Sequence, residues 1–221
     1  MKRFLRRRFR HVLVDVDTQY DLFTQANHDA TVLLAHVRRL MAWARQRQVP
    51  VISTAISRPY SVSTVRTPQA PQGCTEGTPG QHKLRYTTLN SQIVFGAENR
   101  FDLPRNLLDD YQQVVFEKRS DDPFAQPRAD RLLTEVKTDE FVVFGMGTST
   151  AIKATVLGLL HRGKRVLVVY DAVDRSDKRT STMALRQMEA KGARMVTTEY
   201  LTGRSHLRGA TTLRLKSASA V

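Results

Sequence analysis

Short apolar, β-branched runs alternate along the chain with longer amphipathic stretches. The apolar runs fall within the range of about four to eight residues that favours strands over helices. Six strands are predicted on this basis: His11–Val16, Pro50–Thr54, Gln113–Glu117, Glu140–Gly145, Arg165–Tyr170 and Arg194–Thr198.

Four helices are predicted between these strands, at His28–Gln48, Arg128–Val136, Thr150–Gly163 and Ser181–Lys191. The first has Asn27 in a position to cap its N-terminus. Its apolar side chains recur at helical spacing and form a stripe of Leu33, Val37, Leu40, Met41 and Ala44. His36 lies on this stripe, where a hydrogen-bonded core histidine is a more common finding than a ligand-binding one.

Strands that alternate with helices and are continuously apolar predict a single α/β domain. Its sheet has six mostly parallel strands with helices on both faces, in three αβα layers. Right-handed crossovers in such a sheet place ligands at the carboxyl ends of the strands. The segment Ser57–Asn99 interrupts the rhythm, because it is long, polar and rich in Pro, Gly and Thr. Loops of this length in compact domains are usually functional or disordered.

Composition excludes several classes of protein. No apolar run reaches the roughly 18 residues of a membrane span, and the first ten residues lack the apolar core of a secretory signal. The single cysteine, Cys74, rules out an internal disulfide and a cysteine-rich zinc site. We therefore expect a cytoplasmic protein that makes no membrane contact.

The net charge of +14 is concentrated at the two ends of the chain. Residues 1–10 carry six Lys or Arg and residues 204–221 carry four, and neither segment contains an acid. The domain between them, residues 11–203, holds only the remaining +4. The two tails are compatible with an arm for nucleic acid or an acidic partner, or with solvated chain ends. The second interpretation is favoured, because no stacking aromatics or recognised nucleic-acid module accompany the charge.

Three predicted strand ends carry residues that could perform chemistry. By alternation Asp15 and Asp17 share one face of the first strand, and Asp17, at its end, could act as a general acid or base. Lys118 follows the third strand and could pair with that carboxylate or polarise a substrate oxygen. The fourth strand ends in the Gly145–Ala151 turn, whose N–H groups at a helix start could hold negative charge. Asp and Lys at strand ends are also common as solvated caps.

Five segments carry motifs in a fixed order along the chain: Asp17–Phe23, Cys74–Gly80, Lys118 with Asp122–Phe124, Gly145–Thr155 and Asp171–Val173. The first is similar to a D-x-Q-x-D-F signature, the second to C-V-x-G-T-x-G and the fourth to G-x-x-T-D-x-C-V-x-x-T. Together they resemble the isochorismatase-like cysteine hydrolases, which include nicotinamidases, N-carbamoyl amide hydrolases and isochorismatases. The resemblance spans residues 9–203, and it implies the Rossmann-like isochorismatase fold and assembly into homo-oligomers.

The same resemblance implies a catalytic triad of Asp17, Lys118 and residue 151. In active amidohydrolases position 151 holds the cysteine that attacks the carbonyl, but here it is Ala151. The resemblance also implies a non-proline cis peptide near Met146–Gly147 that aims an N–H at an oxyanion hole. Substrate-binding positions are expected at Gln19, Phe23, Arg58, Met146 and Gly147.

Departures from the family pattern change the expected chemistry. Ala151 has no nucleophile, and the hydroxyls of Ser149 and Thr150 lack an adjacent base and should point away from the direction of residue 151. Cys74 belongs to another loop and is interpreted as a packing residue. After Thr54, the positions of the nicotinamidase D-x-H metal pattern hold Ile56 and Arg58, so no metal and no other cofactor are expected. Arg58 could instead bind an anionic substrate group or be an ordinary surface arginine.

One branch of the resembled family needs no cysteine, because isochorismatases hydrolyse a vinyl ether by acid catalysis. Asp17 and Lys118 would suffice for chemistry of that kind. The sequence therefore predicts a hydrolase that acts on a small molecule without a covalent cysteine. The competing hypothesis is a pseudoenzyme that kept the pocket and binds a ligand or protein partner. A third is binding of nucleic acid or an acidic partner through the tails.

Overall fold

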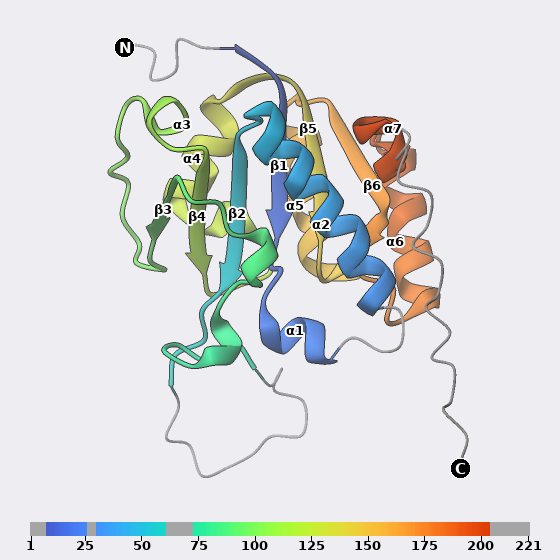
Figure 1. Ribbon diagram of the computed structural model, residues 1–221, viewed down its shortest axis with the longest axis horizontal. Helices are drawn as coiled ribbons and strands as arrows, with labels where there is room; N and C mark the ends of the chain where they lie inside the picture. The colour runs from blue at the N-terminus through green and yellow to red at the C-terminus, as the bar shows by residue number, and fades with distance from the viewer. Residues whose placement is uncertain (1–7, 26–29, 61–72, 204–221) are drawn as a thin grey trace, which may run out of the picture.

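The computed structural model describes residues 8–25, 30–60 and 73–203. They form one sheet of seven parallel strands in the order β3-β4-β2-β1-β5-β6-β7 (Figure 1). The strands are β1 (Arg8–Val16), β2 (Val51–Ile56), β3 (Gln92–Phe95), β4 (Gln113–Lys118), β5 (Lys137–Gly145), β6 (Val166–Val173) and β7 (Arg194–Val196). All six predicted strands are present, with ends that differ by a few residues.

The seventh strand, β3, was missed, and it lies inside the segment Ser57–Asn99 that was expected to be a loop. It is an edge strand that pairs with β4 and with no other strand of the described residues. Its residues are half-buried or exposed, with Val94 54% exposed. A short edge strand of this kind carries no continuous apolar run, so periodicity does not reveal it.

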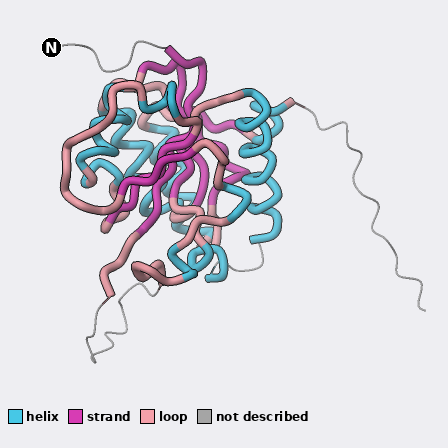
Figure 2. The backbone as a smooth tube through the Cα atoms, turned by 60° about the vertical axis from the view of Figure 1, so that its left-hand side comes forward, coloured by secondary structure: helices cyan, strands magenta, loops and turns pink. Residues whose placement is uncertain are grey.

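Helices cover both faces of the sheet, as Figure 2 shows by the helices on either side of the strands. One face is covered by α1 (Tyr20–Gln25), α2 (Ala30–Arg47) and α7 (Thr198–Thr202). The other face is covered by α3 (Leu107–Asp110), α4 (Pro127–Glu135), α5 (Lys153–His161) and α6 (Lys178–Ala190). Short 3₁₀ turns at Pro79–Gln81, Arg85–Thr87 and Pro123–Ala125 complete the layers. The prediction of three αβα layers is confirmed.

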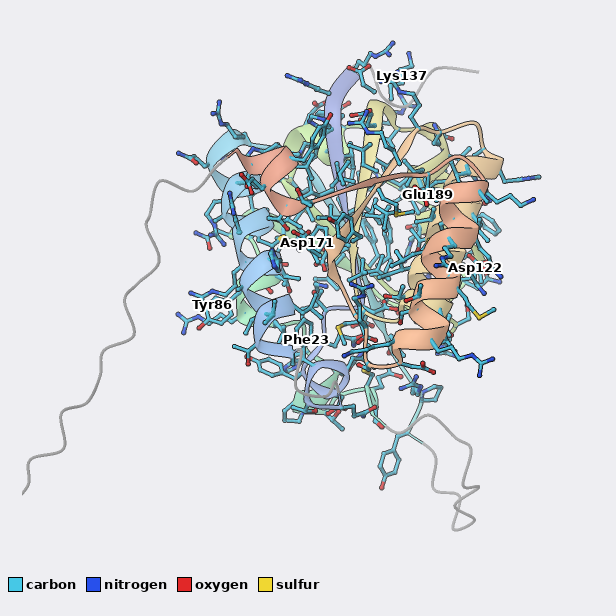
Figure 3. The ribbon with its side chains drawn as sticks, turned by 90° about the vertical axis from the view of Figure 1, so that its right-hand side faces the viewer. Phe23, Tyr86, Asp122, Lys137, Asp171 and Glu189 are labelled. Carbon is cyan, nitrogen blue, oxygen red and sulfur yellow. The ribbon has the colours of Figure 1, made fainter. Side chains whose placement is uncertain are left out.

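The predicted stripe of α2 is buried at all five positions. Its proposed cap, Asn27, lies outside the described residues. His36 is half-buried and its Nδ1 lies 3.4 Å from Asp171 Oδ2. Asp171 is on β6 and lies between that strand and α2 in Figure 3. The histidine thus has a protein partner, as expected of a structural residue.

β1 is the central strand, and its side chains alternate between two apolar layers. Val12, Val14 and Val16 pack toward α4, α5 and α6. Leu13 packs toward α2 on the other face, and Asp15 follows it on that face. The strand begins at Arg8, within the range assigned to the N-terminal tail, and residues 1–7 and 204–221 lie outside the described residues.

The ends of β1 and β5 are in direct backbone contact. Gly145 has φ +127°, and a Cβ placed on it would lie 2.1 Å from the carbonyl oxygen of Val16. Only glycine allows this approach. The contact places the end of β1 and the turn after β5 beside each other. The helices of the described ranges include none long and apolar enough to cross a membrane.

Candidate functional site

A pocket of about 390 Å³ lies at the carboxyl ends of β1, β2, β5 and β6. It is bounded by apolar, charged and backbone groups from these four strand ends and from α1. The lining residues are Asp17, Leu22, Gln25, Ile56, Arg58, Asp121, Met146, Gly147, Thr150, Ala151, Asp174 and Ser176. Of the eight site residues expected from the sequence, Asp17, Arg58, Met146, Gly147 and Ala151 meet here. This is the location that the parallel sheet predicts.

Asp17 is the first residue after strand β1, where the backbone turns. Its φ of +51° is in the left-handed region, so the alternation of the strand ends before it. The expectation that Asp15 and Asp17 share one face is therefore wrong. Asp15 accepts a hydrogen bond from Ser53 Oγ, whereas Asp17 accepts one from the hydroxyl of the next residue on β2, Thr54. Adjacent strand residues face opposite ways, so the two carboxylates lie on opposite faces.

The Asp17 carboxylate is held at both oxygens. Thr54 Oγ1 donates to Oδ1 at 2.6 Å and Lys118 Nζ lies 2.7 Å from Oδ2. Asp17 is 2% exposed and Lys118 is 1% exposed. The ammonium also donates to the carbonyl oxygens of Ser120 and Asp121, at 3.0 and 3.2 Å. All three of its N–H donors are thus used, and Lys118 itself is not among the residues that line the pocket.

Ala151 occupies the position where the sequence pattern expects a nucleophile. It lies in a π-helical turn, Thr148–Ile152, which precedes α5. Single π-helical turns occur mainly at functional sites. The alanine is 2% exposed and lines the pocket together with Asp17. The pocket therefore has the residues that surround a nucleophile but presents a methyl group in its place.

The expected cis peptide is absent from the described residues, all of whose peptide bonds are trans. The Met146 N–H donates to the carbonyl of Val16 at 2.8 Å, continuing the pairing of the two strand ends. Gly147, with φ +69° and ψ 57°, makes the turn in the left-handed conformation instead. Its N–H has no acceptor within the described ranges. The turn thus leaves the Gly147 N–H beside the pocket, without the peptide geometry that the resemblance implied.

The two neighbouring hydroxyls differ in position. Thr150 lines the pocket, contrary to the expectation that it points away, because the π-helical turn widens the spacing of side chains. Ser149 is not among the lining residues. Thr150 Oγ1 lies 3.5 Å from the carbonyl of Gly147 and makes no hydrogen bond to Asp17. Within the described residues, neither hydroxyl donates a hydrogen bond to a carboxylate or imidazole that could act as its base.

Three of the expected substrate-binding residues have other roles in the structure. Arg58 lines the pocket and also donates to the carbonyl of Gly73. Gln19 is fully buried. Its side-chain amide accepts a hydrogen bond from the N–H of Ile56 and donates to the carbonyl oxygens of Ile56 and Gln81. Phe23 is 8% exposed and packs into the apolar layer under α2. Leu22, its neighbour, and Gln25 are the residues of α1 that line the pocket.

Cys74 is buried, outside the pocket lining, with φ +55°. Its N–H donates to Asp21 Oδ2 at 2.6 Å. Burial raises the pKa of its thiol to about 11. A thiol that stays protonated at neutral pH is a poor nucleophile. The structure therefore agrees with a packing role for this residue.

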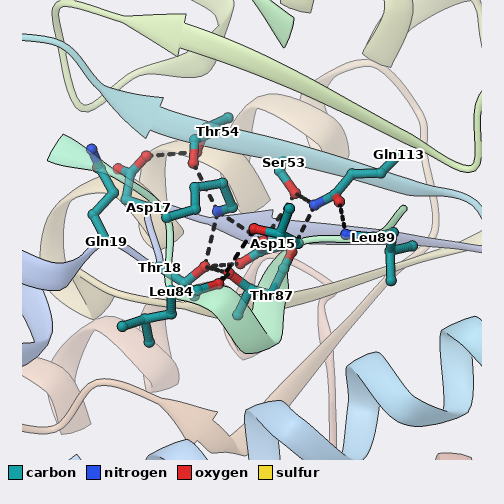
Figure 4. Close-up of polar contacts among 12 residues, drawn as sticks. Asp15, Asp17, Thr18, Gln19, Ser53, Thr54, Leu84, Thr87, Leu89 and Gln113 are labelled. Atoms are coloured by element: carbon teal, nitrogen blue, oxygen red, sulfur yellow. Dashed lines mark hydrogen bonds and ion pairs between the residues drawn. The ribbon is translucent and has the colours of Figure 1, made fainter. Parts of the chain in front are cut away.

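A second buried ion pair lies on the opposite face of the sheet, beside the network of Figure 4. Lys83 Nζ lies 2.8 Å from Asp15 Oδ2 and also donates to Thr18 Oγ1 at 2.8 Å. Thr18 Oγ1 in turn donates to the other Asp15 oxygen at 2.7 Å. The sequence indicates Asp15 as one member of such a pair, because a carboxylate buried within an apolar strand requires a partner. Nothing in the sequence indicates Lys83, which lies in the loop between β2 and β3, as that partner.

Seven lining residues were not expected at the site from the sequence: Leu22, Gln25, Ile56, Asp121, Thr150, Asp174 and Ser176. Asp174 follows β6, so the rule that places sites at strand ends could have found it. No group of three or more His, Cys, Asp or Glu suited to a metal occurs within residues 8–25, 30–60 and 73–203. Asp17, the obvious acidic ligand, is already neutralised by Lys118.

The sequence profile of the isochorismatase domain matches residues 11–200, which is most of the chain. The chain belongs to the isochorismatase family. No curated protein sequence matches it.

Solved structures resemble this member of the family in fold. The zinc complex of the pyrazinamidase of Pyrococcus horikoshii has a TM-score of 0.64 at 19% identity, with 85% of this chain and 98% of that chain covered. N-carbamoylsarcosine amidase of Thermoplasma acidophilum has a TM-score of 0.62 at 19% identity, with 86% and 98% covered. The MAR1 ribonuclease of Caenorhabditis elegans has a TM-score of 0.58 at 21% identity, with 86% and 78% covered. The isochorismatase-like fold expected from the motifs is thereby confirmed.

Proposed function

We propose that this chain is a hydrolase of the isochorismatase family that acts on a small molecule without a covalent cysteine. One observation carries the proposal: Asp17, held by Lys118 and Thr54, opens onto the same pocket as the methyl group of Ala151. Asp17 supplies a group that can transfer a proton. Ala151 leaves room for substrate at the position where a cysteine would place its thiol.

Asp17 is the proposed general acid and base. In hydrolysis of a vinyl ether its carboxyl proton moves to the enol carbon, and the electrons of the double bond form the new C–H bond. Water then adds to the resulting oxocarbenium carbon and returns a proton to Asp17, and the hemiacetal breaks down to its carbonyl and alcohol. The Lys118 ammonium, 2.7 Å from Oδ2, stabilises the carboxylate that exists between these two transfers.

The remaining pocket residues orient the substrate. Arg58 is the one cation among the described residues that line it, so we propose that it binds an anionic group of the substrate. Leu22, Ile56 and Met146 supply apolar walls that limit the entry of water. The Gly147 N–H is placed to donate to a substrate oxygen at the turn. Two of the structures similar to this chain are a pyrazinamidase and an N-carbamoylsarcosine amidase, but Ala151 excludes attack by a thiol at that position.

The proposal is tested by turnover of the wild-type protein on isochorismate, nicotinamide and an N-carbamoyl amide. The Asp17→Asn variant is assayed alongside, with Asp110→Asn as the matched control because Asp110 is exposed on α3. We expect turnover of one substrate in the wild type and the control, and a loss of at least a hundredfold in Asp17→Asn. Equal turnover in Asp17→Asn, with an unchanged melting temperature, would contradict the role of Asp17.

The alternative is a family member that binds a ligand without converting it. It is favoured by the same methyl group at position 151 and by the fully used donors of Lys118. It predicts that a substrate analogue raises the melting temperature while no product forms. Stabilisation that is lost in Arg58→Gln would place such binding in this pocket.

A further inference from the structure

A groove of about 580 Å³ lies on the opposite face of the sheet from α6, between α2 and the turn Arg85–Thr87. One wall consists of Arg38, Arg39, Ala42 and Arg45 of α2. The other consists of Arg85, Tyr86, Thr88 and Asn90. None of the residues that line it is acidic. This groove has no part in the chemistry proposed for the pocket at the strand ends.

The spacing on α2 builds the groove. Arg38, Ala42 and Arg45 are separated by four and three residues, so they lie in one row along the helix. The small side chain of Ala42 leaves a hollow between the two long arginines. The opposite stripe of the helix, including Val37 and Met41, is buried against the sheet. The basic row therefore faces outward, over a distance of about 10 Å.

The arginines of the groove are not neutralised by the protein. Arg38, Arg45 and Arg85 are exposed, and the ion pairs of the described residues include none of the three. α2 contains no acidic residue at all. Charges arranged in this way attract a polyanion. They also repel the same face of a second copy of the chain.

An aromatic ring completes the groove. Tyr86 is 48% exposed, and the Arg38 guanidinium lies 4.3 Å from the centre of its ring. Figure 3 shows Tyr86 at the outer edge of the molecule beside α2. Guanidinium groups bind phosphate through paired N–H donors, while exposed aromatic rings stack on bases. A groove with arginines on both walls and one ring at its side therefore combines the two contacts that a nucleotide chain offers.

We propose that this groove binds single-stranded nucleic acid. The arginines contact successive phosphates and Tyr86 stacks on an unpaired base. An anionic membrane is disfavoured, because the apolar stripe of α2 is buried and Tyr86 is the one large apolar side chain among the described residues that line the groove. An acidic protein segment would use the arginines but would leave the stacking ring unexplained. This site is independent of turnover at the pocket.

The test uses the full chain and a fluorescently labelled 12-nucleotide oligouridylate, followed by fluorescence anisotropy across a salt series. The double variant Arg38→Gln/Arg45→Gln should bind at least tenfold more weakly. Its slope of log affinity against log salt should be shallower by about 1.4, from two phosphate contacts at about 0.7 each. Tyr86→Ala should weaken binding about fivefold or more, and Tyr86→Phe should not.

The matched control is Arg179→Gln/Arg186→Gln on α6, where both residues are exposed and have the same spacing of seven. It removes the same charge from the other face of the sheet. Equal weakening in both double variants would overturn the proposal, because net charge or the basic tails would then account for binding. A 12-residue polyglutamate that binds as tightly as the oligonucleotide, with no effect of Tyr86→Ala, would overturn it in favour of an acidic protein partner.

Discussion

Asp15 and Asp17 are two residues apart, yet their carboxylates lie on opposite faces of the sheet. Lys83 pairs with Asp15 at 2.8 Å and Lys118 pairs with Asp17 at 2.7 Å. The left-handed backbone of Asp17 separates them. One carboxylate is enclosed in a structural network, and the other lines the pocket.

This separation predicts different effects for the same substitution at the two positions. Asp15→Asn removes the countercharge of the 8%-exposed Lys83 and should lower the free energy of unfolding by about 3 kcal/mol. Asp17→Asn likewise leaves Lys118 without its countercharge and should destabilise the protein by a similar amount, but it should in addition abolish the chemical step. Urea denaturation and kcat of both variants check this, and loss of kcat in Asp15→Asn under conditions where it is fully folded would argue against a purely structural role.

Lys118→Met should destabilise the protein strongly. It leaves the carboxylate of Asp17 buried and without its cation, at a cost of about 3–5 kcal/mol. In the double variant Asp17→Asn/Lys118→Met the unpaired charge is gone, so the loss should be clearly smaller than the sum of the two single losses. A double-mutant cycle from urea denaturation measures this coupling. Additive losses would show that the pair contributes no coupling energy.

Ala151→Cys should create a reactive thiol. The side chain would stand at the π-helical turn beside Asp17, whereas Cys74 is buried away from the pocket. In a Cys74→Ala background, the new thiol should react with iodoacetamide at pH 7 at least tenfold faster than Cys74 does in the wild type. Mass spectrometry of the labelled chains gives both rates. A thiol at 151 as slow as Cys74 would mean that the pocket does not activate a nucleophile.

Cys74 should make stability depend on pH in the alkaline range. Burial raises the pKa of its thiol from 9.0 to about 11. Between these values the unfolded chain releases a proton that the folded protein retains, so folding becomes less favourable as pH rises. The free energy of unfolding of the wild type should fall relative to Cys74→Ala from pH 9 to 11 and stay parallel to it below pH 8. Parallel curves throughout would contradict the raised pKa.

Gly145→Ala should be among the most destabilising glycine substitutions. The added Cβ would lie 2.1 Å from the carbonyl of Val16, and φ is +127°. Strain and displaced backbone together cost about 3–5 kcal/mol. Gly163→Ala is the control, since its φ is +68° and an added Cβ has no atom within 4 Å, so about 1–2 kcal/mol is expected there. Thermal denaturation of both variants gives the comparison, and similar losses would show that the strand contact tolerates a side chain.

Much of the fold follows from apolar periodicity, because five of the six predicted strands lie inside the sheet and contain continuous buried runs. β3 was not predicted, because its half-buried and exposed residues form no continuous apolar run. The site is predicted less completely. Strand ends locate Asp17, Lys118 and the Gly145 turn, but alternation cannot foresee the positive φ of Asp17.

Side-chain roles depend on tertiary contacts that spacing does not contain. Gln19 matches a signature position, yet its amide is used to join the backbone of Ile56 and Gln81. Leu22, which interrupts the signature, takes the place at the pocket that was expected of Phe23. The groove beside Tyr86 combines residues from two segments, so the sequence shows its arginines without showing that they face one another.

The main-chain contact between Gly145 and Val16 holds two segments beside each other. One is the end of β1, which Asp17 follows, and the other is the turn after β5, which contains Ala151. The side chain of residue 151 takes no part in that contact. A different side chain at position 151 would therefore leave the main-chain joint between the two strand ends in place.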